Sequence, residues 1–169
     1  MPIRHRVLST AAALLTLLSA TPASVATPAP KSGFTWPLQP RPPVTRRFEP
    51  PPHPYGPGHR GADLAGSVDQ QVLAAGEGIV VFAAPVAGRP VLSIDHPGGL
   101  RTTYEPVAPL LSAGQQVSRG QPIGLLQPGH QPCPAAACLH WGVRRDADYL
   151  DPLRLVDPGH IRLKPWENP

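Results

Sequence analysis

The sequence contains few aromatic residues, few charged residues and only two cysteines. Aromatic residues make up 5% and charged residues 15% of its 169 residues, whereas proline occurs 26 times and glycine 16 times. This shortage of charges, together with the excess of turn formers, disfavours a helical bundle and favours short strands joined by many turns. The chain is also too short for two well-packed cores, so we expect one domain with appendages.

The N-terminal segment has the features of a secretory signal peptide. A basic start at Arg4 and Arg6 precedes an almost wholly apolar stretch at residues 7–18, and small residues end the segment at Ala26. We therefore expect residues 1–26 to be removed on export. The alternative is a retained membrane anchor, but about a dozen apolar residues fall short of the roughly 20 that span a bilayer.

The charge of the expected mature chain is nearly balanced. Loss of two arginines with the signal peptide leaves 13 basic residues against 11 acidic residues, a net charge of +2. The basic residues form no cluster interleaved with aromatic residues, which argues against nucleic acid as a partner.

Residues 27–58 form a proline-rich N-terminal arm. Proline lacks the amide donor that a helix or a central strand needs, so we expect neither element here. Two interpretations remain open. The segment is either a flexible tether, or an arm whose apolar residues, among them Phe34, Trp36 and Leu38, pack on the domain.

From residue 71 onward, short apolar runs alternate with turn signals, which predicts a meander of antiparallel strands. The predicted strands are residues 72–75, 79–84, 91–95, 100–104 and 139–143, with further strand structure within 117–126. A short helix is expected only within residues 149–156, and residues 158–169 are a tail. The predicted fold class is all-β, with antiparallel sheets and one short C-terminal helix.

Residues with metal-binding chemistry concentrate in two short segments. The first runs from His59 through a glycine to Asp63, and the second contains Cys138 and His140. Zinc prefers nitrogen, sulfur and carboxylate oxygen ligands, and a catalytic zinc site uses three protein ligands and one water. His59, Asp63 and His140 could supply those three, although spacing alone is a weak signal because a histidine near an aspartate is more often a solvated pair.

Several ordered segments resemble motifs of the lysostaphin-like (LytM-type) zinc metalloendopeptidases. They are the H-x-x-x-D sequence at 59–63, the strand run at 72–80, the V-x-x-G-Q-x-I-G run at 117–124, the segment 138–140 at the place of the family's H-x-H, and the ending at 149–153. Taken in order, these partial matches are more specific than any one of them. The resemblance covers about residues 36–156.

This resemblance implies a peptidase domain at residues 59–157, with a groove-type zinc site on antiparallel sheets of the duplicated hybrid motif type. It implies Zn²⁺ held by His59, Asp63 and His140. It also implies that the exported protein is a monomer that hydrolyses peptidoglycan peptides in the cell envelope.

The sequence departs from the family pattern at two positions where an assisting histidine is expected. Cys138 stands at the first histidine of the H-x-H motif, and Pro106 stands at the other. A positioned proton-transfer group typically contributes a hundredfold or more to the rate, so its loss matters. The candidates to replace these groups are Glu105, His130 and His53.

Two classes of function therefore remain open. Retention of all three zinc ligands favours a metallopeptidase. Loss of the two histidines favours a catalytically degenerate module that binds the wall or regulates another cell-wall hydrolase.

Cys138 has three possible roles. It lies two residues before His140 on an expected strand, so the two side chains point the same way and Cys138 should stand near the metal. It could then be a fourth zinc ligand or a nucleophile. An exported chain with only one other cysteine, Cys133, favours a disulfide between the two. Trp141, between these positions, is expected in the core, with the rim of the cleft as the alternative.

Overall fold

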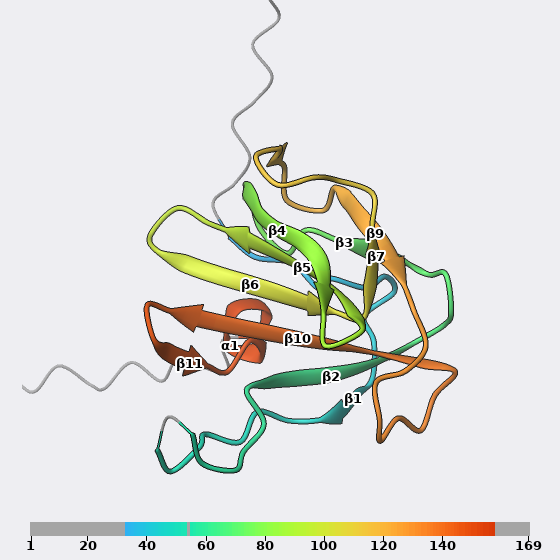
Figure 1. Cartoon of the computed structure of the whole chain (residues 1–169), viewed down its shortest axis with the longest axis vertical. Helices are drawn as coiled ribbons and strands as arrows, with labels where there is room; N and C mark the ends of the chain where they lie inside the picture. Colours follow the sequence, from blue (N-terminus) through green and yellow to red (C-terminus); the bar gives the residue numbers. More distant parts are fainter. Residues whose placement is uncertain (1–32, 54, 158–169) are drawn as a thin grey trace, which may run out of the picture.

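The computed structural model describes residues 33–53 and 55–157, which form two antiparallel sheets (Figure 1). The predicted signal peptide, the first residues of the arm and the C-terminal tail lie outside the described residues. Within the described part, no helix is long and apolar enough to cross a membrane.

The larger sheet contains most of the strands. In spatial order they are β1 (Val44–Arg46), β2 (Gly61–Gly66), β10 (Ala137–Arg145), β6 (Leu100–Glu105), β5 (Arg89–Asp95), β4 (Gly78–Val86) and β8 (Gln116–Val117), with β11 (Asp148–Leu150) paired to β10. The smaller sheet contains β3 (Gln71–Leu73), β9 (Pro122–Leu126) and β7 (Val107–Pro109). The helix α1 (Leu153–Val156) follows β11. The all-β prediction with one short C-terminal helix is confirmed.

The predicted meander is correct only for β4, β5 and β6, which are neighbours in both sequence and space. Beyond them, β10 pairs with β6, and β2 pairs with β10. Residues 59–63 were recognised from the sequence as a motif, and no strand was predicted there. That omission was wrong, because the small side chains of β2 give little strand signal while its backbone pairs with β1 on one side and β10 on the other.

Alternate residues of β2 and β10 face opposite sides of the large sheet, as the period of two requires. Leu64, Leu139 and Trp141 are fully buried in the hydrophobic core, so the expectation for Trp141 is confirmed. Asp63 and His140 lie one position away from core residues and therefore point to the other face. Packing of the core residues thus fixes the register between β2 and β10, and this register places Asp63 and His140 on the opposite face.

The described part of the arm packs on the domain. Leu38 is fully buried, and Phe34 and Trp36 contact the core cluster. The backbone is also attached, since the Thr35 amide donates to the Ala75 carbonyl at 2.8 Å. Residues 33–46 are therefore an integrated part of the fold, and β1 supplies an edge strand next to β2.

Candidate metal centre

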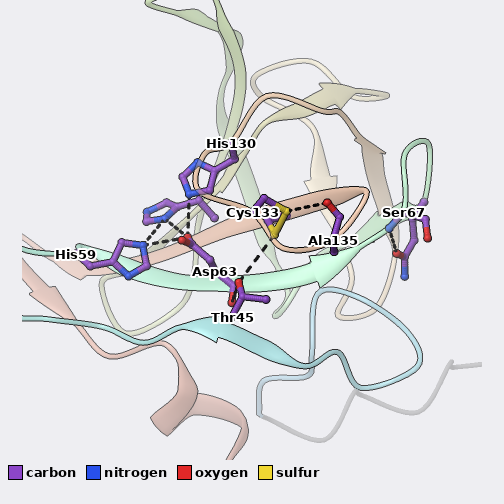
Figure 2. The surroundings of a disulfide bond; sticks show 10 residues. Thr45, His59, Asp63, Ser67, His130, Cys133 and Ala135 are labelled. Atoms are coloured by element: carbon purple, nitrogen blue, oxygen red, sulfur yellow. Dashed lines mark hydrogen bonds and ion pairs between the residues drawn. A yellow bond between two sulfur atoms is a disulfide. The ribbon is translucent and has the colours of Figure 1, made fainter.

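Four side chains gather on the face of the large sheet opposite the core. They are His59, Asp63, His130 and His140, whose ligand atoms all lie within 4.8 Å of one another. Figure 2 shows His59, Asp63 and His130 pointing toward one another from separate segments of the chain. Among the described residues, no other group of His, Cys, Asp and Glu side chains meets the same criterion.

His59 is fixed just before β2 by a backbone bridge to Glu49, with two hydrogen bonds of 2.9 and 3.0 Å. Its side chain is only 6% exposed. The Nδ1 atom lies 2.7 Å from the carbonyl oxygen of Arg47. A carbonyl can only accept, so Nδ1 carries a proton and Nε2 is the nitrogen that faces the cluster.

Asp63 and His140 are direct neighbours across the β2–β10 ladder. Asp63 Oδ1 lies 2.9 Å from His140 Nδ1 and 2.9 Å from His59 Nε2. The two imidazole nitrogens are themselves 3.1 Å apart. The three atoms that could bind a metal therefore form a compact triangle: His59 Nε2, Asp63 Oδ1 and His140 Nδ1.

Gly61 makes room for this arrangement. A Cβ atom at position 61 would lie 2.6 Å from the carbonyl oxygen of Trp141 and 2.7 Å from Nε2 of His140. Only glycine avoids both collisions, and this steric requirement explains why position 61 is a glycine.

His130 comes from the loop between β9 and β10. Its Nε2 lies 3.0 Å from Asp63 Oδ1, and its ring centroid is 5.3 Å from that of His140. Of the three assisting candidates named from the sequence, only His130 joins the cluster.

The other two candidates lie elsewhere. Glu105 stands opposite His140 on β6 and is paired with Arg89, the two side chains being 16% and 52% exposed. It lines the same groove without belonging to the cluster. His53 is exposed in the loop before His59 and is not part of the cluster.

The environment of Asp63 stabilises its ionised form. Burial alone would raise the pKa of this carboxyl group. Hydrogen bonds from His130 and His140, with the charges of His130 and His59, outweigh burial and hold the pKa of Asp63 well below its usual range. The buried side chain is therefore a carboxylate.

The donor set fits a zinc ion. A tetrahedral site with zinc–ligand bonds of about 2.0–2.1 Å separates its ligands by about 3.3 Å, close to the 2.9–3.1 Å edges of the triangle. In addition, Asp63 Oδ2 is buried and has no hydrogen-bond partner among the described residues. A buried carboxylate oxygen without a partner is costly, and a bound cation would offset that cost.

A groove passes over the cluster. Two adjoining cavities of about 270 and 250 Å³ share Arg60, Glu105 and His140 in their walls. Further arginines line them at positions 46, 89 and 144. A separate cavity of about 600 Å³ near His96 contains none of the four clustered residues, so the size of a cavity does not identify the site here.

The predicted disulfide between Cys133 and Cys138 is present, with the Cα atoms 5.7 Å apart. Cys138 is therefore neither a thiolate ligand nor a nucleophile in this oxidised state. Its sulfur lies 3.9 Å from Oγ1 of Thr45, whose hydroxyl donates to the carbonyl oxygen of Asp63 at 3.1 Å. The disulfide thus adjoins the strand that carries the cluster (Figure 2).

The sequence profile of Peptidase family M23 matches residues 57–152 of the chain. An uncharacterized protein of Mycobacterium tuberculosis strain H37Rv is 51% identical over 167 residues, covering 95% of this chain. The chain spans 66% of the length of that relative. The peptidoglycan DD-endopeptidase ShyA of Vibrio cholerae is 38% identical over 86 residues, which is 49% of this chain and 18% of that protein.

Solved structures show the same fold. A zinc-containing peptidase from Vibrio cholerae superposes with a TM-score of 0.60 at 28% identity, over 72% of this chain and 39% of that chain. The catalytic domain of lysostaphin from Staphylococcus simulans gives a TM-score of 0.56 at 21% identity, over 66% of this chain and 90% of that chain. The lysostaphin-like resemblance predicted from the sequence is confirmed.

Proposed function

The chain belongs to Peptidase family M23, and from that premise we propose that it is an exported zinc metallopeptidase acting on peptidoglycan peptides in the cell envelope. In this proposal, His59, Asp63 and His140 hold one Zn²⁺. The observation that carries the proposal is the cluster itself, because three compatible metal ligands and one further imidazole, that of His130, meet at the groove.

Zinc in such a site supplies Lewis acidity toward a carbonyl oxygen and an activated water. The chain's own residues contribute position and charge. His59 is oriented by the Arg47 carbonyl, and Asp63 and His140 are held by the β2–β10 ladder. All three are therefore fixed by backbone hydrogen bonds before any metal arrives, which lowers the entropic cost of binding.

His130 is the best placed of the candidates for proton transfer. It alone lies within hydrogen-bond distance of a proposed ligand, whereas Glu105 is engaged with Arg89. His130 therefore supplies the cluster with an additional imidazole. The family pattern would provide this group at position 138, where the chain has a cysteine. This supports a peptidase over the degenerate module, since the chain keeps an ionisable side chain beside the metal ligands.

The charges along the groove suit a peptide that carries carboxylates. Four arginines border the groove and Glu105 is the single acidic residue among its described lining residues. Complementary charge favours encounter and orientation of an acidic ligand. A stem peptide of peptidoglycan offers such carboxylates.

Export is supported by two features. The residues 1–26 have the order of a signal peptide, and a disulfide persists in an oxidising compartment rather than in the cytosol. Mass measurement of the protein recovered from the producing cell tests this, since cleavage after residue 26 predicts a chain that begins at Thr27.

The alternative function is a zinc-binding module that binds the wall or regulates another cell-wall hydrolase. The replacement of the two expected histidines by Cys138 and Pro106 favours it. Metal analysis of the purified mature protein, combined with a peptidoglycan digestion assay, separates the two functions.

One zinc per chain, with release of soluble peptides that stops on chelation and returns with Zn²⁺, supports the peptidase. Stoichiometric zinc without digestion supports the module instead. A chain that binds no zinc contradicts both functions as stated here.

A further inference from the structure

We propose that His130 is a positioning residue that orients the Asp63 carboxylate for metal binding, and that the Cys133–Cys138 disulfide is the device that holds His130 in place. This inference rests on the proposed metal site and gives His130 a role in metal binding that is separate from proton transfer. It predicts that a covalent bond between two residues that are not ligands controls metal affinity.

The contact between His130 and Asp63 is specific. Among the described residues, the approach of Nε2 to within 3.0 Å of Asp63 Oδ1 is the polar contact of the His130 side chain. Groups that hydrogen-bond to a ligating carboxylate fix its orientation, and their loss typically weakens metal binding about 10- to 100-fold. His130 is only 16% exposed, so solvent does not compete strongly for Nε2.

The segment that carries His130 has little else to hold it. Gln127 ends the preceding strand region with a backbone hydrogen bond to Pro106, and β10 begins at Ala137. Within the described residues, residues 128–136 make no backbone–backbone hydrogen bond. A segment without such bonds samples many conformations unless another contact restrains it.

The disulfide supplies that restraint. Cys138 is 1% exposed on β10, on the same face as His140, and it ties down Cys133. Three residues span at most about 10 Å, so a fixed Cys133 confines His130 to the neighbourhood of the cluster. Without the disulfide, the first residue after His130 that is held by a strand is Ala137. The whole segment 128–136 must then be ordered to keep His130 near Asp63.

The three proposed ligands do not share this dependence. His59 is held by the bridge to Glu49, and Asp63 and His140 belong to paired strands. Opening the disulfide therefore removes His130 while the ligand triangle remains. The expected result is a site that still binds metal with the same ligands, but more weakly.

The test compares four proteins: the wild type, His130→Ala, the double variant Cys133→Ala/Cys138→Ala, and the triple variant. Zn²⁺ affinity is measured by competition with a chromophoric chelator. His130→Ala and the cysteine pair should each weaken binding about 10- to 100-fold. The triple variant should be no weaker than either, because both changes remove the same contact.

Additive losses in the triple variant, or unchanged affinity in the cysteine variant, would overturn the proposal. Circular dichroism confirms that each variant keeps the β fold. Reduction of the folded wild type with tris(2-carboxyethyl)phosphine provides a second route to the open disulfide and should match the cysteine variant.

Two further measurements distinguish positioning from other roles. His130→Gln can still donate to Asp63 Oδ1 and should recover most of the affinity, whereas Gln131→Ala, a neighbour in the same loop, should leave it unchanged. The visible spectrum of the Co²⁺-loaded protein should keep its band positions in His130→Ala. Loss of a nitrogen ligand in that spectrum would overturn a role through Asp63.

A metal-free measurement keeps this inference separate from the proposed function. Diethyl pyrocarbonate modification of each histidine is followed by mass spectrometry, with exposed His53 as the internal standard. His130 should react slowly in the wild type and approach the rate of His53 in the cysteine variant. Equal rates of His130 in the two proteins would contradict the disulfide's role even if zinc binding proved the site correct.

Discussion

The imidazole of His59 donates its Nδ1 proton to the backbone carbonyl of Arg47 across 2.7 Å. This contact leaves Nε2 as the atom that faces Asp63 and His140. A histidine whose outer nitrogen is fixed in this way is the usual arrangement of a metal ligand. The neighbouring backbone, rather than the metal, therefore determines which nitrogen is offered.

Replacement of His59 or His140 by alanine should abolish stoichiometric zinc binding. Each removes one corner of the triangle, and two remaining donors do not complete a zinc site. Metal content after dialysis, measured by atomic emission, checks this. His53→Ala is the matched control, because His53 is exposed in the adjoining loop. Unchanged zinc in both ligand variants would show that the assigned site is wrong.

Gly61→Ala should disturb the site although residue 61 carries no ligand. Its Cβ would meet the Trp141 carbonyl and the His140 ring at less than 3 Å, and such overpacking typically costs about 1–3 kcal/mol. We expect a lower free energy of unfolding in urea and weaker zinc binding. Gly142→Ala is the control, since its Cβ would meet nothing closer than 3.4 Å. Equal effects of the two substitutions would contradict this explanation.

Glu105→Gln and His130→Gln should affect digestion of peptidoglycan differently. Glu105 is paired with the half-exposed Arg89, and such a pair contributes little, so its loss should lower the rate less than about tenfold. His130→Gln keeps a donor to Asp63 but cannot take up a proton, so the rate should fall about a hundredfold while zinc stays bound. Digestion rates measured on zinc-loaded proteins check both, and a larger loss in Glu105→Gln would assign proton transfer to Glu105.

The strands that the sequence predicted correctly are those whose apolar residues are bounded by turn signals. β5 and β6 lie within one residue or two of their expected ends because turns at Gly88 and Gly99 delimit them. β2 escaped prediction because its residues are mostly small and its position depends on pairing with β10, which is distant in sequence. A local sequence pattern reveals strands that turns delimit, but it does not reveal a strand whose position depends on pairing with a distant segment.

The same distinction holds for the candidate site. The H-x-x-x-D motif and the strand of His140 could be recognised in the sequence. His130 could only be named as one of three polar candidates, because its approach to Asp63 depends on the path of a loop without regular structure. The signal that pointed toward it was the neighbouring Cys133, whose bond to Cys138 brings that loop to β10.

His96 directly follows β5, and its side chain is buried although it stands next to a turn. The ring is 6% exposed and donates from Nδ1 to the Glu77 carbonyl at 2.7 Å, while Nε2 lies 2.7 Å from the Thr102 hydroxyl. The edge of Phe34 packs against it, with ring centroids 5.1 Å apart. Both ring nitrogens therefore have a hydrogen-bond partner inside the fold, and because the Glu77 carbonyl can only accept, Nδ1 carries a proton.

This environment predicts a specific loss of stability in mild acid. Burial lowers the pKa of His96, and the Glu77 carbonyl and the nearby Asp95 only partly oppose that effect. The unfolded chain, with a histidine pKa of about 6.5, then binds a proton at higher pH than the folded chain. Its contribution to stability is full above that pH and is lost as the pH falls below it.

The variant His96→Asn isolates this effect because its amide can still donate to the Glu77 carbonyl but does not titrate. Between pH 8 and pH 5, the free energy of unfolding of the wild type should fall more steeply than that of the variant. Urea titrations in the presence of a chelator measure both proteins without a contribution from bound metal. The other ionisable side chains are the same in the two proteins, so their contributions cancel in the difference. Parallel pH profiles would show that His96 is not held neutral by the fold.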